Sequence, residues 1–318
     1  MKNVKGICSD IIPKNAMAIH NVLNNKGYDT YFVGGALRDY YINELLGSSF
    51  KIKDWDIVTT ARYDVMQALF NKILRLNENG RIVSKTGKTD LLIPKLETTG
   101  ISINKQLFEV TPMNIFNGDE ICFTNDITED LSKRDFTINT IAYSPKLGLI
   151  SNFKTSEGVY VDAIEDIKNK VIKSTYNADL AFKRNRFNMI RAIIFANKYG
   201  FAIEEDTLNA IKSNISSVNE INKGKLFIGF EKLIMCEFTN SIIYIKDTGL
   251  LNVLCDHWND NYSDELINLL MRLNELDINT CVNRLEFLYD NFSNKELIIK
   301  LYKSLGVNKD IIYKIEYK

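Results

Sequence analysis

Short runs of β-branched and aromatic residues alternate with turn residues in the first half of the chain, a pattern typical of mixed α/β structure. All four prolines lie before residue 146, and eleven of the sixteen glycines lie at or before Gly158. The runs predict strands at 31–33, 55–59 and 107–110 and helices at 36–46 and 64–73. Residues 135–143 fit either element, and residues 80–104, which mix Gly, Lys and Thr, are expected to form a mobile loop.

The second half has apolar residues at helical spacing and few helix-breaking residues. Residues 179–199 carry apolar side chains at positions 182, 187, 190, 194 and 195, which predicts one helix with a buried stripe, ended by Gly200. Further stripes predict helices at 207–215, 225–236 and 264–276, arranged as a bundle or array. We expect the α/β half to end within residues 146–160.

Composition narrows the class of protein. The chain has 318 residues, 45% apolar and 25% charged, as in folded proteins of two or three domains. Two histidines argue against a multi-histidine metal site, and five cysteines without a CxxC pair argue against zinc ribbons, thioredoxin-like sites and disulfide frameworks. The cysteine pattern favours a reducing, cytoplasmic location, and no segment has the length and polarity of a membrane span.

The formal net charge of zero hides an uneven distribution. Eight basic residues and one acid lie between Ile167 and Gly200, whereas eighteen acids and thirteen bases follow from Glu204 onward. A basic segment of this kind is either a solvated helix face or a surface that contacts nucleic-acid phosphates.

A glycine pair and two aspartates form the first chemical motif. Gly34-Gly35 follows a predicted strand and precedes a predicted helix, so that backbone amides and the start of the helix can face a phosphate. Asp54 and Asp56 are two residues apart on the next predicted strand and would share one face. Two carboxylates beside a phosphate-binding turn are suited to binding Mg²⁺. Glu109, on the third predicted strand, is a candidate third carboxylate, or a solvated acid.

The second motif runs from Asp130 to Asn139. Lys133 and Arg134 could contact a triphosphate, Arg through its bidentate fork. Asp135 and Asn139 could bind ribose hydroxyls or hold Arg134 in place, and Asp135 could alternatively cap a helix.

These motifs resemble those of class II tRNA nucleotidyltransferases, the CCA-adding enzymes, and of the related bacterial poly(A) polymerases. The family pattern is GGxVRD, DxDxxT and RRDFTIN, and this chain has GGALRD, DWDIVT and KRDFTIN in the same order. Residues 182–196 also resemble the family's base-reading motif, F-x-E-D-x-x-R-x-x-R-A-x-R-F-A. The resemblance covers about residues 10–255.

The resemblance implies an α+β fold: a nucleotidyltransferase head, or palm, with a mixed five-stranded sheet over residues 1–150. A helical neck with the base-reading motif would span 151–205, and a helical, RNA-binding body with a reduced tail 206–318. It implies catalytic roles for Asp54, Asp56 and Glu109, with the two aspartates binding Mg²⁺, as two ions. The implied nucleotide-binding residues are Gly34, Gly35, Arg38, Asp39, Lys133, Arg134, Asp135, Asn139, Arg184, Asn185, Asn188 and Arg191.

The base-reading motif departs from the family pattern. Its Glu, Asp and Arg positions fall here on Arg184, Asn185 and Asn188. Asp only accepts hydrogen bonds and Arg only donates them, whereas Asn does both, so recognition of cytosine or adenine is less strictly enforced. On one continuous helix Arg184, Asn188 and Arg191 would share a face. Met113-Asn114 also replaces the family's Phe-Arg pair.

The function expected from the resemblance is template-independent addition of all or part of CCA to a tRNA 3′ end, from CTP and ATP with release of pyrophosphate. Alternatives are poly(A) or single-nucleotide tailing with altered base specificity, and a non-catalytic RNA-binding relative. Expected partners are tRNA or another RNA and nucleoside triphosphates, without a membrane, with the chain a monomer or a homodimer. The expected RNA contacts beyond the nucleotide site are Lys183, Arg186 and Lys198.

Overall fold

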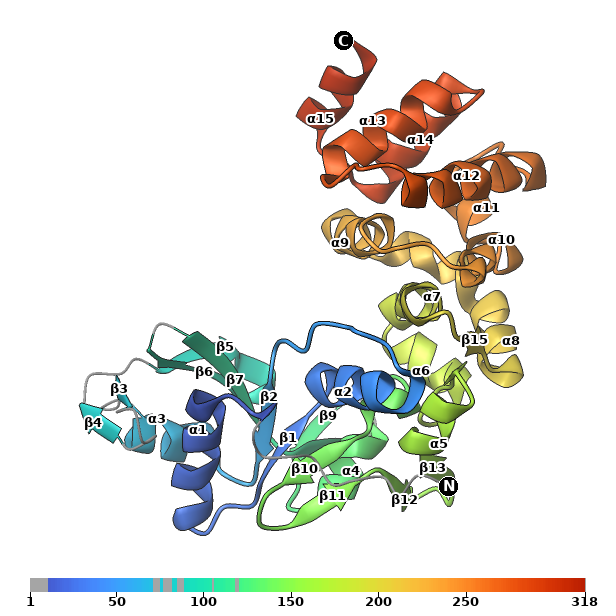
Figure 1. The fold of residues 1–318 in the computed structure, drawn as a ribbon. Helices are drawn as coiled ribbons and strands as arrows, with labels where there is room; N and C mark the ends of the chain where they lie inside the picture. Colours follow the sequence, from blue (N-terminus) through green and yellow to red (C-terminus); the bar gives the residue numbers. More distant parts are fainter. Residues whose placement is uncertain are drawn as a thin grey trace. The chain divides into compact units, whose positions relative to one another are not determined.

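The computed structural model describes residues 11–70, 75–76, 82–84, 89–104, 106–117 and 120–317. Contacts divide the chain into two compact units, the first ending at Lys168 and the second beginning at Asn169. Each unit is described separately, with the element labels of Figure 1. In the described part of the chain, no helix is both long enough and apolar enough to cross a bilayer.

The first unit is built on a mixed seven-stranded sheet of order β11-β10-β1-β2-β7-β6-β5 (Figure 1). Its strands are β1 (Thr30–Val33), β2 (Asp56–Thr59), β5 (Thr89–Ile93), β6 (Thr98–Ile103), β7 (Gln106–Pro112), β10 (Ala142–Ser144) and β11 (Gly148–Ile150). β1 pairs antiparallel with both β10 and β2, whereas β2 pairs parallel with β7. The α+β class is confirmed, and the sheet has seven strands where five were expected.

Two of the strands that were not predicted, β5 and β6, come from the segment 80–104, which was expected to be a loop. Thr98 and Thr99 are buried there, and the Thr98 and Thr111 hydroxyls lie 3.0 Å apart across the β6–β7 pair. Residues 80–81 and 85–88 of this segment lie outside the described residues. The segment 135–143 is neither one helix nor one strand: it forms the 3₁₀ turn η3 (Thr137–Asn139), and β10 begins at Ala142.

In the described residues of this unit, five α-helices accompany the sheet: α1 (Lys14–Asn25), α2 (Gly35–Leu46), α3 (Tyr63–Phe70), α4 (Ile127–Ser132) and α5 (Ala163–Lys168). α1 contacts β1, α3 contacts β5 and β6, and α2 packs against α5 and η3. Three small two-stranded sheets complete the described part of the unit: β3 (Arg75–Leu76) with β4 (Ile82–Ser84), β8 (Asn114–Asn117) with β9 (Glu120–Phe123), and β12 (Asn152–Lys154) with β13 (Tyr160–Asp162). The predicted helix 64–73 is α3 as far as Phe70, and residues 71–73 are not described.

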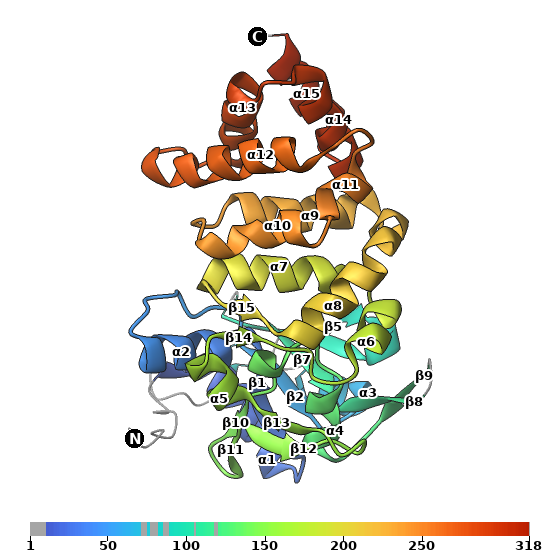
Figure 2. The same cartoon turned by 90° about the vertical axis from the view of Figure 1, so that its right-hand side faces the viewer.

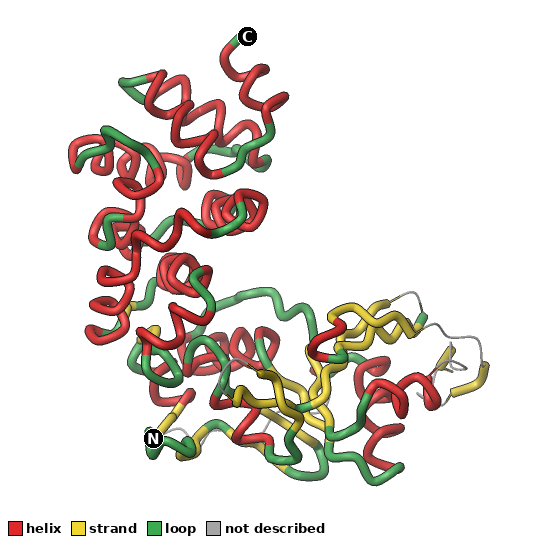
Figure 3. Tube along the Cα trace, turned by 180° about the vertical axis from the view of Figure 1, so that it is seen from behind, coloured by secondary structure: helices red, strands yellow, loops and turns green. Residues whose placement is uncertain are grey.

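The second unit is almost entirely helical (Figure 3). Its helices are α6 (Ala178–Arg184), α7 (Phe187–Tyr199), α8 (Glu205–Asn214), α9 (Lys223–Ile234), α10 (Tyr244–Asp247), α11 (Leu250–Leu254), α12 (Asp260–Arg272), α13 (Cys281–Asn291), α14 (Lys295–Leu305) and α15 (Lys309–Glu316). Figure 2 shows α7, α9 and α12 as successive layers. The predicted helices 207–215, 225–236 and 264–276 correspond to α8, α9 and α12.

The predicted single helix over 179–199 is wrong, because the chain breaks at Asn185. This residue ends α6 in an extended conformation, with φ −141° and ψ 91°, and α7 starts at Phe187. A short parallel pair, β14 (Val171–Ile172) with β15 (Ala202–Ile203), closes the segment that contains both helices. Arg184 therefore belongs to a different helix from Asn188 and Arg191, so the three do not share one helix face.

Side chains fix the layers of the second unit to one another. A Cβ atom on Gly229 of α9 would lie 2.9 Å from the ring of Phe187, so only glycine allows α7 to pack this closely. Arg284 of α13 donates to the carbonyls of Ile234 and Cys236 at 2.6 and 3.1 Å, which satisfies the C-terminal end of α9.

Candidate active site

The turn at Gly34 brings backbone, carboxylate and guanidinium together. β1 ends at Val33, Gly34 has φ 79° and ψ −141°, and α2 starts at the next residue. A Cβ atom at Gly34 would lie 2.9 Å from Oδ2 of Asp56 and 3.6 Å from Nη1 of Arg134. The conformation and the close approach both require glycine here, and the turn thereby joins the two sequence motifs at one point.

Asp56 and Glu109 lie on the parallel strands β2 and β7, whose register pairs Ile57 with Val110. Burial raises the pKa of Asp56 to about 6; the charge of Arg134 opposes this shift, and those of Glu109 and Asp54 add to it. The three carboxylates are therefore close enough to repel one another.

Asp54 is exposed and lies before β2, with a left-handed φ of 54°. The prediction that Asp54 and Asp56 share a strand face is wrong, because the strand begins only at Asp56.

The carboxylates are suited to binding a divalent cation whose remaining coordination positions are filled by other oxygen ligands. Carboxylate oxygen is the donor that Mg²⁺ prefers, and a cation would offset the repulsion from Glu109 and Asp54 that adds to the effect of burial on the pKa of Asp56. In the described part of the chain, no group of three or more His, Cys, Asp or Glu side chains is arranged to hold a metal ion by itself. A cation bound here would therefore need water or a phosphate group to complete its coordination.

Lys133 and Arg134 are held by a buried carboxylate that the sequence interpretation did not single out. Asp130 is 1% exposed, and its two oxygens lie 3.0 Å from Nζ of Lys133 and 3.1 Å from Nη2 of Arg134. It also accepts a hydrogen bond of 3.1 Å from the backbone amide of Asn114, whose side-chain oxygen accepts from Lys133. Burial alone would raise the pKa of Asp130, but the charges of Arg134 and Lys133 outweigh it and lower the pKa.

The buried residues Arg38, Asp39 and Asn139 and the half-buried Asp135 form a network that connects the two motifs. Arg38 donates to Asp39 at 2.9 Å and to Oδ1 of Asn139 at 2.6 Å. Nδ2 of Asn139 in turn donates to Asp135 at 2.8 Å. Their hydrogen bonds connect α2 with η3. Within the described residues, none of the four lines the cavity described next, so they lie beside the site.

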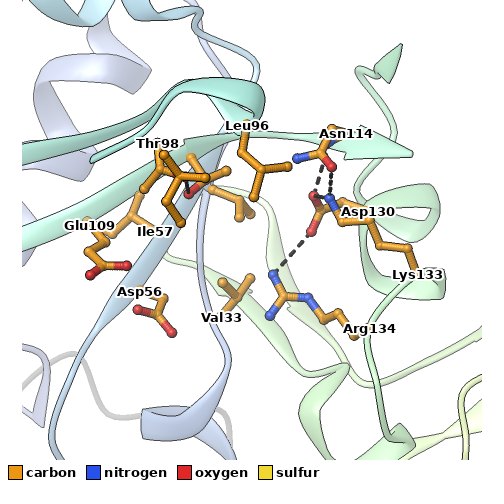
Figure 4. A pocket seen from close by; sticks show the side chains of 13 residues that line it. Val33, Asp56, Ile57, Leu96, Thr98, Glu109, Asn114, Asp130, Lys133 and Arg134 are labelled. Atoms are coloured by element: carbon orange, nitrogen blue, oxygen red, sulfur yellow. Dashed lines mark hydrogen bonds and ion pairs between the residues drawn. The ribbon is translucent and has the colours of Figure 1, made fainter. Parts of the chain in front are cut away.

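A cavity of about 240 Å³ lies among these groups (Figure 4). Asp56 and Glu109 line one side, and Asn114, Asp130, Lys133 and Arg134 line the other. The remaining lining is formed by Val33, Ile57, Val58, Ile93, Leu96, Thr98 and Thr111. Nε of Arg134 is buried without a hydrogen-bond partner in the described structure. The cavity thus offers carboxylates for a cation opposite cations for an anion.

The second unit holds the other predicted site residues. Nδ2 of Asn185 donates to Oδ1 of Asn188 at 3.0 Å; Asn188 is 8% exposed, whereas Asn185 is exposed. This bond leaves the oxygen of Asn185 and the amide NH₂ of Asn188 to face other groups. Arg184 lies 5.8 Å from the ring of Tyr176, and Arg191 lies 4.9 Å from that of Phe195.

Two of the three expected RNA-contacting cations have partners within the unit. Arg186 pairs with Glu220 at 2.7 Å, and Lys198 donates to the hydroxyl of Tyr199 at 2.9 Å. Lys183 is exposed at the end of α6.

The nucleotidyltransferase palm class is defined by a mixed sheet that carries a glycine turn, carboxylates on its strands and cations facing them. In this chain a helical unit follows the sheet. Residues 30–173 match the family described as "Poly A polymerase head domain". Residues 200–260 match that described as "Probable RNA and SrmB- binding site of polymerase A". Over residues 30–173 the chain therefore belongs to the poly(A) polymerase head-domain family.

Curated relatives carry the name CCA-adding enzyme. The protein of Ligilactobacillus salivarius is 27% identical over 302 residues, which are 94% of this chain and 68% of the relative. That of Geobacillus kaustophilus is 29% identical over 243 residues, 76% of this chain and 54% of the relative. The chain therefore spans about two thirds of one relative and about half of the other.

Solved structures establish the fold. The Bacillus stearothermophilus CCA-adding enzyme in complex with CTP has a TM-score of 0.76 at 24% identity, covering 96% of this chain and 69% of that one. The Thermotoga maritima CCA-adding enzyme complexed with tRNA has a TM-score of 0.66 at 20% identity, covering 96% and 70%.

Proposed function

We propose that the protein transfers nucleoside monophosphates from CTP and ATP to the 3′-hydroxyl of tRNA, completing all or part of CCA. The observation that carries the proposal is the convergence of Gly34, Asp56, Glu109 and Arg134 at one cavity. The names of the relatives and the presence of both family regions support it. In this proposal residues 1–150 act as the head, 151–205 as the neck and 206–318 as the RNA-binding body.

In the reaction, the 3′-oxygen of the RNA attacks the α-phosphorus, and the bond from that phosphorus to the leaving pyrophosphate oxygen breaks. Asp54 and Asp56 would hold Mg²⁺, with Glu109 beside them. When bound, Mg²⁺ lowers the pKa of the attacking hydroxyl and neutralises charge on the leaving group. Lys133 and Arg134 bind the triphosphate from the opposite side of the cavity, and the hydroxyl proton passes to solvent.

Six further residues assist nucleotide binding in this proposal. Gly34 and Gly35 offer the start of α2 to the nucleotide phosphates, where backbone amides and the helix dipole favour negative charge. Arg38 and Asp39 anchor this loop through the network with Asn139 and Asp135. We assign the charged and amide side chains of this network to holding the loop in shape. Asp135 and Asn139 would in addition bind the sugar of the nucleotide.

Base selection is assigned to Asn185 and Asn188. In the observed orientation, the pair offers an acceptor on Asn185 and a donor on Asn188, which complements the amine and ring nitrogen of cytosine or adenine. If both amides rotated together, their mutual hydrogen bond would persist and the offered pattern would reverse, matching uracil or guanine. This pairing favours a second candidate function, 3′-tailing with relaxed base choice. Arg184 and Arg191 supply additional donors near the pair.

RNA binding is assigned to the basic segment that includes Lys183, Arg186 and Lys198. The Arg186–Glu220 pair has side chains that are 38% and 62% exposed, so breaking it to contact a phosphate costs little. RNA affinity should fall as salt rises, because phosphate contacts release counterions. Replacing Lys183, Arg184 and Arg186 by Ala should flatten that dependence; an unchanged slope would place the RNA elsewhere.

The central test uses purified protein, Mg²⁺ and tRNAs that end before, within and after CCA, with each NTP supplied separately. We expect CMP and AMP to be incorporated on the incomplete ends, and Asp54→Ala to reduce incorporation to background. Glu44→Ala, which removes an exposed carboxylate of α2 away from the cavity, is the matched control and should retain activity. No incorporation by the wild type, with RNA still bound, would instead favour a non-catalytic RNA-binding protein.

A further inference from the structure

Asp130 lies on the same side of the cavity as Lys133 and Arg134, opposite Asp56 and Glu109. It lies on α4, is almost fully buried, and contacts Lys133 and Arg134 through separate oxygens. Arg134 also has Nη1 directed toward the Gly34 turn, where Oδ2 of Asp56 lies. In the described structure, Arg134 nevertheless forms its ion pair with Asp130, at 3.1 Å.

The two carboxylates near Arg134, Asp130 and Asp56, differ in whether their oxygens are available to a metal ion. Asp130 is buried among its partners and has both oxygens occupied by Lys133, Arg134 and the Asn114 amide. Asp56 stands beside Glu109 and Asp54, and its carboxylate is the one suited to a metal ion. A guanidinium paired with Asp56 would occupy the oxygens that a metal ion needs.

We propose that Asp130 is a positioning residue that directs Lys133 and Arg134 toward the phosphates and keeps Arg134 from pairing with Asp56. Asn114 completes the arrangement, since its amide donates to Asp130 and its side-chain oxygen accepts from Lys133. The assignment rests on the proposed function, because it assumes that the cavity binds a metal ion and a nucleotide. Asp130 itself acts through the two cations and does not touch the substrate.

The test measures Mn²⁺ binding by electron paramagnetic resonance, in the absence of RNA and turnover. Asp130→Asn removes the charge and keeps the shape of the side chain. Arg134 is then released toward Asp56, and we expect Mn²⁺ affinity to fall roughly tenfold, the effect of one charge-assisted contact. Replacing Arg134 as well, in Asp130→Asn/Arg134→Gln, should restore wild-type Mn²⁺ affinity although nucleotide binding stays weak.

The matched control is Asp126→Asn on the same helix. Asp126 caps α4 by accepting from Thr128 N, a role that Asn also performs, and it does not belong to the described lining of the cavity. This variant should keep wild-type Mn²⁺ and nucleotide affinities. Turnover provides the second readout: Asp130→Asn should raise the Mg²⁺ concentration needed for half-maximal activity and the KM for NTP, and excess Mg²⁺ should recover most of kcat.

The outcomes separate the inference from the proposed function. Unchanged Mn²⁺ affinity in Asp130→Asn, or a double variant as weak as the single one, would overturn the positioning role even if the wild type adds nucleotides to tRNA. If Asp130→Asn fails to fold, the double variant, which removes both members of the buried pair, is compared with Arg134→Gln. Equal Mn²⁺ affinities in those two proteins support the proposal, and a weaker double variant contradicts it. Absence of turnover in the wild type would contradict only the proposed function.

Discussion

The substitution Gly34→Ala tests whether the turn at the end of β1 sets the position of the Asp56 carboxylate, to which we have assigned a catalytic role. Gly34 combines a φ of 79° with a ψ of −141°, a conformation available essentially to glycine alone. A methyl group added there would lie 2.9 Å from Oδ2 of Asp56. The substitution therefore strains the backbone and pushes directly against the carboxylate.

The two effects can be estimated separately. A non-glycine residue in this conformation costs about 1–3 kcal/mol of folding free energy. Rotating Asp56 away from its preferred side-chain conformation adds about 0.5–1.5 kcal/mol. Because a displacement of a reacting group by about 1 Å can lower the rate roughly a hundredfold, we expect kcat to fall by about that factor.

Gly47→Ala is the matched control. Gly47 ends α2 with a φ of 71°, and a Cβ atom there would meet nothing within 4 Å. This variant carries backbone strain of about 1–2 kcal/mol without any contact to a carboxylate. Incorporation of labelled CMP into tRNA is compared for the two variants at a temperature where urea titration shows both to be fully folded.

The reasoning would be refuted if Gly34→Ala retained activity within twofold of Gly47→Ala. It would also fail if both variants lost activity in parallel with their loss of stability. In either case, the approach of Gly34 to Asp56 would have no bearing on the chemistry.

Three further results are expected. Asn188→Arg should raise the preference for CTP and ATP over UTP and GTP about tenfold or more, measured as ratios of kcat/KM, since a fixed donor replaces a reversible amide. Burial lowers the pKa of His20 below its usual value of 6.5. As the pH falls, the unfolded chain therefore binds a proton at His20 before the folded chain does. The stabilisation from neutral His20 should be complete above about pH 6.5 and decline below it. In urea unfolding experiments, this decline should be smaller for His20→Gln. Arg284→Met should destabilise the second unit by about 2–4 kcal/mol and speed hydrogen exchange at the end of α9, because two carbonyls lose a charged donor.

Each result has a contrary outcome. Unchanged nucleotide ratios in Asn188→Arg would remove that residue from base selection. Parallel pH profiles of wild type and His20→Gln would mean that other groups account for the acid sensitivity. Wild-type exchange rates at α9 in Arg284→Met would mean that water replaces the guanidinium without cost.

The grouping of the turn and the carboxylates could be predicted because short motifs place them on or next to strands. Gly34 follows β1, Asp56 begins β2, and Glu109 lies on the parallel neighbour β7, so local sequence and sheet register suffice to bring them together. The role of Asp130 was not predicted, although its spacing of three and four residues from Lys133 and Arg134 on a helix was a usable signal.

Other features depend on interactions that residue patterns do not report. The apolar stripe continues across Asn185, so periodicity gave no sign that α6 ends there. Strand β6 is buried by its neighbours despite its threonines: the Thr98 hydroxyl pairs with that of Thr111 across the sheet, and the Thr99 hydroxyl donates to the carbonyl of Glu97. In β6, pairing with neighbouring strands overrides the local preference of the sequence.

The parallel pair β14–β15 has a consequence for engineering. Val171 pairs with Ala202 and Ile172 with Ile203, and the amide of Ala202 donates to the carbonyl of Lys170 at 2.9 Å. Residues 173–201, with α6 and α7, thus form an excursion whose two ends are fastened together. If this segment is exchanged whole for the corresponding stretch of a relative, the proposed base selection by Asn185 and Asn188 predicts that the base preference of that relative is transferred with it.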